Sequence, residues 1–190
     1  MLARVSNIDA FRRWREDDDQ TVEDLVHFLT TDEPTEAMKA GTAFHKALEL
    51  AEPGEHDTLE ALGYRFHLTG GEVELPTTRE LRGYGNYGGL TVTGQVDGIH
   101  GTTVTDHKTT SRFDPERYLA GYQWRFYLDL FHADTFRWNI FEITEIEPQV
   151  YRVAAPQILT AYRYPEMSAD CANLAADFLV FANRYLRDAA

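Results

Sequence analysis

The sequence is poor in the features that mark cross-linked, secreted or membrane-bound proteins. One cysteine, Cys171, stands among 190 residues, which excludes an internal disulfide and any zinc or iron–sulfur site with four cysteine ligands. No apolar run approaches the ~20 residues that a transmembrane helix needs. The first residues, MLARVSNIDAFRRW, contain neither the apolar segment nor the small-residue cleavage site of a secretory signal. We therefore expect a soluble, cytoplasmic protein without a membrane partner.

Basic residues are also scarce. Lysine and arginine total 18 against 31 aspartates and glutamates, so the formal net charge is −13. A protein that coats nucleic acid usually carries a basic surface, because neutralising phosphates supplies most of its non-specific affinity. The acidity argues against that class of protein. It is compatible with a metal-dependent enzyme, because carboxylate ligands count as negative until the cation binds.

Helical periodicity dominates the first fifty residues. Ser6 is a candidate N-cap for a helix that reaches Arg15, and Thr21, with Asp24 at the capping-box position, begins a second. A third helix is predicted from Thr35 to about Ala51. It places His45 on an apolar face one turn after a glycine. A lone histidine in such a place is more often a hydrogen-bonded core residue than a ligand, and both interpretations stay open.

From residue 64 the apolar residues recur at every second position, and helical spacing is found again later in the chain. Strands are predicted at 64–69, 72–75, 79–84, 90–100, 102–108, 135–144 and 149–154. The glycine- and tyrosine-rich tract at 82–89 is interpreted as a hairpin tip or flexible loop. A continuous helix is predicted from Pro115 to about His132, and another from Ser168 to Arg187. This order indicates an α/β fold with a central mixed sheet flanked by helices. We expect one domain over 1–190, with an N-terminal helical attachment at 1–34, a core at 35–154 and C-terminal helices at 155–190.

The stretch from Gly94 to Tyr127 carries the candidate chemistry. The turn at Gly101 makes an antiparallel hairpin that brings Asp97 close to Asp106. Lys108 is two residues after Asp106 and shares its face of the strand. Two adjacent carboxylates repel unless a cation or an ammonium compensates, and oxygen ligands suit Mg²⁺ or Mn²⁺. The alternative is an ordinary surface cross-strand pair without chemistry.

A fixed order of short motifs favours the chemical interpretation. Gly-Thr-Ala-Phe-His lies on a helix, Gly-Gln-Val-Asp on a strand, Asp-His-Lys on the next strand and Gln-x-x-x-Tyr on a helix, where Gln123 and Tyr127 share one face. Over roughly residues 35–130 this arrangement resembles the PD-(D/E)xK nuclease superfamily, which has a restriction-endonuclease-like core, and specifically its RecB-type or Cas4-type exonuclease branch.

The resemblance assigns a role to each residue of this arrangement. It implies that Mg²⁺ or Mn²⁺ is held by His45, Asp97, Asp106 and the backbone carbonyl of His107, with both aspartates and Lys108 catalytic. Gln123 and Tyr127 would contact the DNA backbone or support the site. Glu49, one turn beyond His45, would orient that histidine. Arg112, Arg117 and Arg125 flank the site, where they could meet phosphates or pair with acidic residues.

The implied function is metal-dependent hydrolysis of phosphodiester bonds by a DNA exonuclease acting in recombination, repair or phage replication. A bacteriophage enzyme would act in the host cytoplasm. The chain departs from Cas4-type proteins in lacking the four cysteines of an iron–sulfur cluster, and it carries no helicase motifs, so processivity would come from a homo-oligomer or a recombination or replication partner. Two alternatives stay open: a structure-specific endonuclease that uses the same site, and a nuclease-fold protein that binds DNA or protein without cutting.

Overall fold

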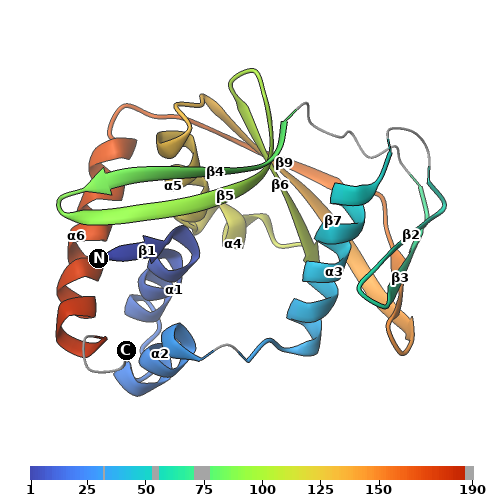
Figure 1. Ribbon diagram of the computed structural model, residues 1–190, viewed down its shortest axis with the longest axis horizontal. Coiled ribbons are helices and arrows are strands. Elements are labelled where there is room, and N and C mark those ends of the chain that lie inside the picture. Colours follow the sequence, from blue (N-terminus) through green and yellow to red (C-terminus); the bar gives the residue numbers. More distant parts are fainter. Residues whose placement is uncertain (32, 53–55, 71–77, 187–190) are drawn as a thin grey trace.

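The computed structural model describes residues 1–31, 33–52, 56–70 and 78–186 and is built on one mixed β-sheet (Figure 1). Its described strands follow the order β1-β5-β6-β7-β8-β3-β2, with β4 also paired to β5 and β9 to β7. The β1–β5, β6–β7 and β3–β8 pairs are parallel, and the other pairs are antiparallel. The strands are β1 (Leu2–Arg4), β2 (Thr58–Ala61), β3 (Tyr64–Leu68), β4 (Thr78–Tyr87), β5 (Leu90–His100), β6 (Thr103–Thr110), β7 (Thr135–Glu147), β8 (Val150–Val153) and β9 (Gln157–Tyr162).

Helices cover this sheet, and the second and third begin where local signals predict. Thr21 and Asp24 form the predicted capping box, and the hydroxyl of Thr35 caps the third helix by accepting from Met38 N. The first helix begins two residues earlier than expected, with Arg4 at the N-cap position, because β1 runs directly into it; the prediction of Ser6 as N-cap was wrong. The helices are α1 (Val5–Arg15), α2 (Val22–Thr30), α3 (Glu36–Leu50), α4 (Pro115–Ala120), α5 (Gln123–Leu130) and α6 (Met167–Tyr185).

The helices divide into two groups, each with its own apolar cluster. The larger cluster lies where α1, α5 and α6 pack against the β4–β7 part of the sheet. The smaller lies under α3, where Phe44 contacts Phe66 and Phe141 at ring-centroid distances of 5.1 and 4.9 Å. Figure 1 shows α3 with the β2–β3 hairpin at one end of the molecule and α1 with α6 at the other. The middle strands, β6 and β7, therefore carry side chains toward both groups.

The glycine-rich tract predicted as a loop is part of a long strand. β4 pairs with β5 continuously from Leu81 to Tyr87, and the turn is confined to Gly88 and Gly89, which both have positive φ. A Cβ on Gly83 would lie 2.9 Å from the Phe131 ring, and one on Gly85 would lie 2.7 Å from Leu130. These glycines are needed because the end of α5 packs against the strand itself. The predicted hairpin tip is confirmed at Gly88 and Gly89, whereas the alternative of a flexible loop over 82–89 was wrong.

Two further predictions fail in the second half of the chain. The helix expected from Pro115 to His132 is broken into α4 and α5 at Gly121 and Tyr122. The segment 155–190, expected to be helical, begins with β9, which adds to β7 as an antiparallel strand before α6 starts. The strand predicted at 72–75 and the helix end predicted at residue 187 lie outside the described residues. No helix in the described part of the chain is long and apolar enough to cross a membrane.

Candidate active site

The two aspartates come together where β5 separates from β6. The strands pair through Gly98 and Thr105, and one further step would place Asp97 opposite Asp106. The side chain of Asp97 continues the ladder where the backbone pairing stops, because its Oδ2 accepts a hydrogen bond of 2.5 Å from the backbone N–H of His107. The hairpin geometry predicted from Gly101 is confirmed, since β5 ends at His100 and β6 begins at Thr103.

Asp106 and Lys108 form a partly buried ion pair on one face of β6. The Lys108 ammonium donates to Asp106 Oδ1 at 3.1 Å and lies 2.9 Å from Oδ2, although Oδ2 receives no hydrogen bond of good geometry. Only 4% of the Asp106 side chain is exposed, against 29% for Lys108. Burial raises the pKa of the Asp106 carboxyl. Burial alone would lower the pKa of Lys108, but the charges of Asp106 and Asp97 outweigh it and raise that pKa.

His45 connects α3 to Asp97. Its Nδ1 lies 3.3 Å from Asp97 Oδ1, and 30% of the imidazole side chain is exposed. Helix α3 comes close at Gly41, where a Cβ would lie 3.1 Å from the Thr109 hydroxyl. Burial would lower the pKa of His45, but the hydrogen bond and charge of Asp97 outweigh it and raise that pKa. In turn, although burial would raise the pKa of Asp97, His45 and Lys108 lower it to about 2.

His107 faces the smaller apolar cluster. Its ring lies 6.0 Å from the Phe141 ring, and its Nδ1 lies 3.4 Å from the side-chain amide of Asn139, its register partner on β7. Burial lowers the pKa of His107 to about 4, so the imidazole is neutral at pH 7. The side chain is thus a core residue, as the alternation along the strand predicts, and the role assigned to its backbone carbonyl stays a prediction.

Gln123 and Tyr127 lie on the face of α5 that is turned toward Asp106 and Lys108. The Gln123 amide donates to the Tyr127 hydroxyl at 3.2 Å, and the Tyr127 ring stacks on Phe136 at 6.1 Å. Burial, together with the charge of Asp106, raises the pKa of Tyr127 to about 12. Gly94 makes room for this ring, because a Cβ there would lie 2.4 Å from Tyr127 Cε1. The pair therefore packs beneath the carboxylate–lysine site.

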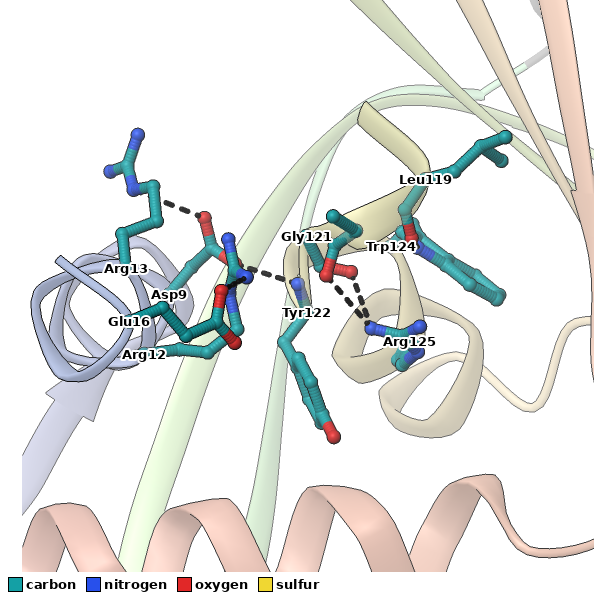
Figure 2. A network of polar contacts seen from close by, with 10 residues as sticks. Asp9, Arg12, Arg13, Glu16, Leu119, Gly121, Tyr122, Trp124 and Arg125 are labelled. Atoms are coloured by element: carbon teal, nitrogen blue, oxygen red, sulfur yellow. Dashed lines mark hydrogen bonds and ion pairs between the residues drawn. The ribbon is translucent and has the colours of Figure 1, made fainter. Parts of the chain in front are cut away.

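Arg112, Arg125 and Glu49 complete the set of predicted residues, and their assigned roles stay predictions. Arg112 is exposed in the loop after β6. The guanidinium of Arg125 turns back to cap α4, with Nη1 donating to the carbonyls of Ala120 at 3.2 Å and Gly121 at 2.8 Å (Figure 2). It also lies over the Tyr122 and Trp124 rings. Glu49 accepts two hydrogen bonds from Lys46, at 2.8 and 2.7 Å, and its predicted role toward His45 stays a prediction.

Sequence reasoning missed the residue that breaks the long helix. Asp9, on α1, accepts a 2.6 Å hydrogen bond from the backbone N–H of Tyr122 (Figure 2). Together with Arg125 it satisfies backbone groups that a continuous helix would have satisfied internally. Asp9 also pairs with Arg12 at 3.6 Å and with Arg13 at 3.7 Å. The only local signal was the i, i+3 and i, i+4 spacing of the acid and the two arginines.

We expect Asp9→Ala to lower the free energy of unfolding by about 1.5–3 kcal/mol, because a largely buried, charged acceptor is lost while its donors stay in place. Urea denaturation measures this change. Asp18→Ala, at an exposed position on the loop after α1, is the matched control, with an expected change within about 0.5 kcal/mol. Equal effects of the two substitutions would show that Asp9 does not brace the break between α4 and α5.

The side chains of this site are of the types that bind a hard cation, but they are not grouped around one point. Its donors are two carboxylates and an imidazole, and one buried oxygen of Asp106 has no hydrogen bond. Within the described residues, no three His, Cys, Asp or Glu side chains are grouped so that they could hold a metal ion. His45 hydrogen-bonds to Asp97, whereas Asp106 is paired with Lys108.

The chain is similar to known proteins in its structure. No family model and no curated protein sequence matches the chain. The crystal structure of SSO0001 superposes with a TM-score of 0.53 at 15% identity, covering 94% of this chain and 75% of that one. A Eubacterium rectale protein, provisionally named an exonuclease, superposes with a TM-score of 0.58 at 13% identity over 98% and 80%. LHK-Exo, solved in complex with dAMP, has a TM-score of 0.46 at 14% identity over 94% and 86%. The chain thus shares its α/β fold, a central mixed sheet flanked by helices with helices at its N-terminus, with the Eubacterium rectale protein.

Proposed function

We propose that this protein is a metal-dependent DNA exonuclease that hydrolyses phosphodiester bonds. The observation that carries the proposal is the Asp106–Lys108 ion pair, which lies next to the Asp97–His45 pair at the point where β5 and β6 separate. A buried carboxylate that retains a charged lysine is costly in a purely structural role. The fold shared with a protein provisionally named an exonuclease, and the resemblance of the motif order to RecB-type nucleases, support the same conclusion.

The chain's own residues suit attack on a phosphodiester. Lys108 stays protonated beside Asp106 and can donate to a phosphoryl oxygen or to the attacking water, where it stabilises negative charge that develops in the transition state. Asp97 fixes the β5–β6 junction through His107 N, and it also orients the His45 imidazole. Tyr127 and Gln123 support the site from α5.

We further propose Mg²⁺ or Mn²⁺ as the cofactor, held by Asp97, Asp106, His45 and the backbone carbonyl of His107. Such an ion would orient the water and polarise the phosphoryl group. His45 already hydrogen-bonds to Asp97, and Asp106 interacts electrostatically with both residues. No iron–sulfur cluster is proposed, since Cys171 is the only cysteine. A cytoplasmic location and a homo-oligomer, recombination or replication partner stay predictions of the sequence.

The function is tested with end-labelled linear DNA and closed circular DNA, each single- and double-stranded, with Mg²⁺, with Mn²⁺ and with EDTA. We expect release of labelled nucleotides from linear substrates only when a divalent cation is present, while circles stay intact. Cleavage of circles would instead favour the structure-specific endonuclease. DNA that stays whole in every reaction, at protein concentrations equal to those of the substrate, would contradict nuclease activity.

The non-cutting alternative has two observations in its favour. The net charge of −13 disfavours close approach of DNA, and the described residues hold no gathered three-ligand metal group. This alternative predicts neither divalent-dependent cleavage nor calorimetric binding of Mn²⁺. The exonuclease predicts both, so titration calorimetry with Mn²⁺ on wild type and on Asp97→Asn separates the two without depending on the choice of DNA substrate.

A further inference from the structure

A cavity of about 330 Å³ adjoins the candidate active site between α1, the end of β6 and the break between α4 and α5. Lys108 and Gln123 line it together with residues that the proposed chemistry has not used. Four cationic side chains contribute to the wall against two carboxylates, Asp9 and Glu16, so the cavity is locally basic in a chain of net charge −13. The cations are Arg12, Arg13, Lys108 and Arg117.

Arg12 is the most deeply buried of these cations, with 10% of its side chain exposed. Its Nη1 is 2.5 Å from Glu16 Oε2, but its Nε has no hydrogen-bond partner, although Asp9 Oδ1 lies 3.6 Å away. A buried guanidinium with an unused N–H is costly unless an acceptor completes it. The neighbouring carboxylates thus hold Arg12 at the cavity wall without satisfying it.

Arg13 and Arg117 supply accessible charge at the same cavity. Half of the Arg13 side chain is exposed, and its ion pair with Asp9 is long, at 3.7 Å. Arg117 is exposed on α4 and makes no ion pair within the described part of the chain. The half-buried ring of Tyr118 lies beside them in the wall. A ligand with one anionic group and a flat apolar part would match this lining.

We propose that this cavity is a phosphate subsite, which binds a backbone phosphate of the substrate strand next to the phosphate being hydrolysed. The proposal rests on the proposed function, because Lys108 and Gln123 belong both to the cavity and to the candidate active site. Arginine forms bidentate hydrogen bonds with phosphate and keeps its charge at any physiological pH. The subsite explains how an acidic protein binds a polyanion, because the basic side chains of the protein are concentrated at the cavity where the DNA strand would bind.

The test measures the binding of a short single-stranded oligonucleotide with a 5′-fluorescein label. Fluorescence anisotropy gives its affinity in the presence of EDTA at a series of salt concentrations. We expect Arg13→Gln and Arg117→Gln each to weaken binding about tenfold. Each is also expected to reduce the slope of log K against log salt by about 0.7, the value for one lost phosphate contact on a single strand. The matched control is Arg15→Gln, which removes the same charge from the side of α1 that pairs with Asp177 on α6, and it is expected to leave both quantities unchanged.

The outcomes separate this subsite from the catalytic proposal. Weaker binding in both variants without any cleavage by the wild type would support the subsite and contradict the proposed exonuclease activity. Cleavage by the wild type with equal affinities and slopes in all three variants would overturn the subsite and leave the exonuclease standing. A wild type that binds no oligonucleotide would also overturn it. Both substituted arginines are exposed, so we expect the thermal unfolding of each variant to match that of the wild type. The affinity and salt slope of each variant are compared with the wild type separately.

Discussion

Replacing Asp106 with asparagine is expected to lower the rate of DNA cleavage by about a hundredfold to a thousandfold, the usual effect of removing one electrostatic group from a reacting centre. The substitution keeps the shape of the side chain but removes the charge that holds the Lys108 ammonium at 2.9 Å. Lys108→Ala should have a comparable effect, because it removes the other half of the pair. Single-turnover cleavage of labelled DNA with Mn²⁺ measures both. Activity within a few-fold of wild type in either variant would contradict the assignment.

A stability measurement separates the chemistry of this pair from its structural role. Breaking a fully buried pair costs ~3–5 kcal/mol, and the cost here should be lower, about 1–3 kcal/mol, because 29% of the Lys108 side chain is exposed. The double variant Asp106→Asn/Lys108→Met removes both charges and should regain most of that stability. If its cleavage stays as low as that of Asp106→Asn, the loss is chemical. Recovery of cleavage along with stability would show that the pair only supports the fold.

Gly94→Ala is expected to destabilise the protein by about 1–3 kcal/mol and to lower cleavage, although alanine suits a strand better than glycine. The added Cβ would lie 2.4 Å from Tyr127 Cε1 and 3.0 Å from Val5 Cγ2. Tyr127 cannot withdraw easily, because its ring is stacked on Phe136 and its hydroxyl is bonded to Gln123. The disturbance would thus reach the face of α5 that lies beneath Lys108. Thermal unfolding and the cleavage assay measure the two effects.

A matched substitution and a rescue make this second prediction specific. Gly41→Ala adds the same methyl group to α3, where it meets only the Thr109 hydroxyl at 3.1 Å. Alanine has a higher helix propensity than glycine, by up to about 1 kcal/mol, so no loss of stability is expected. Tyr127→Leu should relieve the clash, so the double variant with Gly94→Ala should lose less stability than the two single changes add up to. Strict additivity, or a Gly94→Ala protein as stable as wild type, would contradict the proposed close packing.

Local patterns in the sequence determined the parts of this fold that depend on neighbouring residues. The capping box of Thr21 and Asp24, the α3 helix that carries His45, and the hairpin around Gly101 all follow from signals a few residues long. The alternation along β6 placed Asp106 and Lys108 on one face, and the hairpin brought Asp97 beside them. Helix caps, turns and strand alternation are short-range effects, so a single sequence contains them.

Contacts between distant segments decided the rest. The break between α4 and α5 depends on Asp9, more than a hundred residues earlier, and the glycines of β4 serve the packing of α5 and not a flexible loop. Strand β9 forms because β7 offers a partner, and the guanidinium of Arg125 donates to carbonyls at the end of α4. The arginines of α1 join Lys108 in one cavity only in the folded chain. The sequence alone determined which chemical groups this protein has, and tertiary packing decided which of them face each other, because that depends on energies shared between segments far apart in the chain.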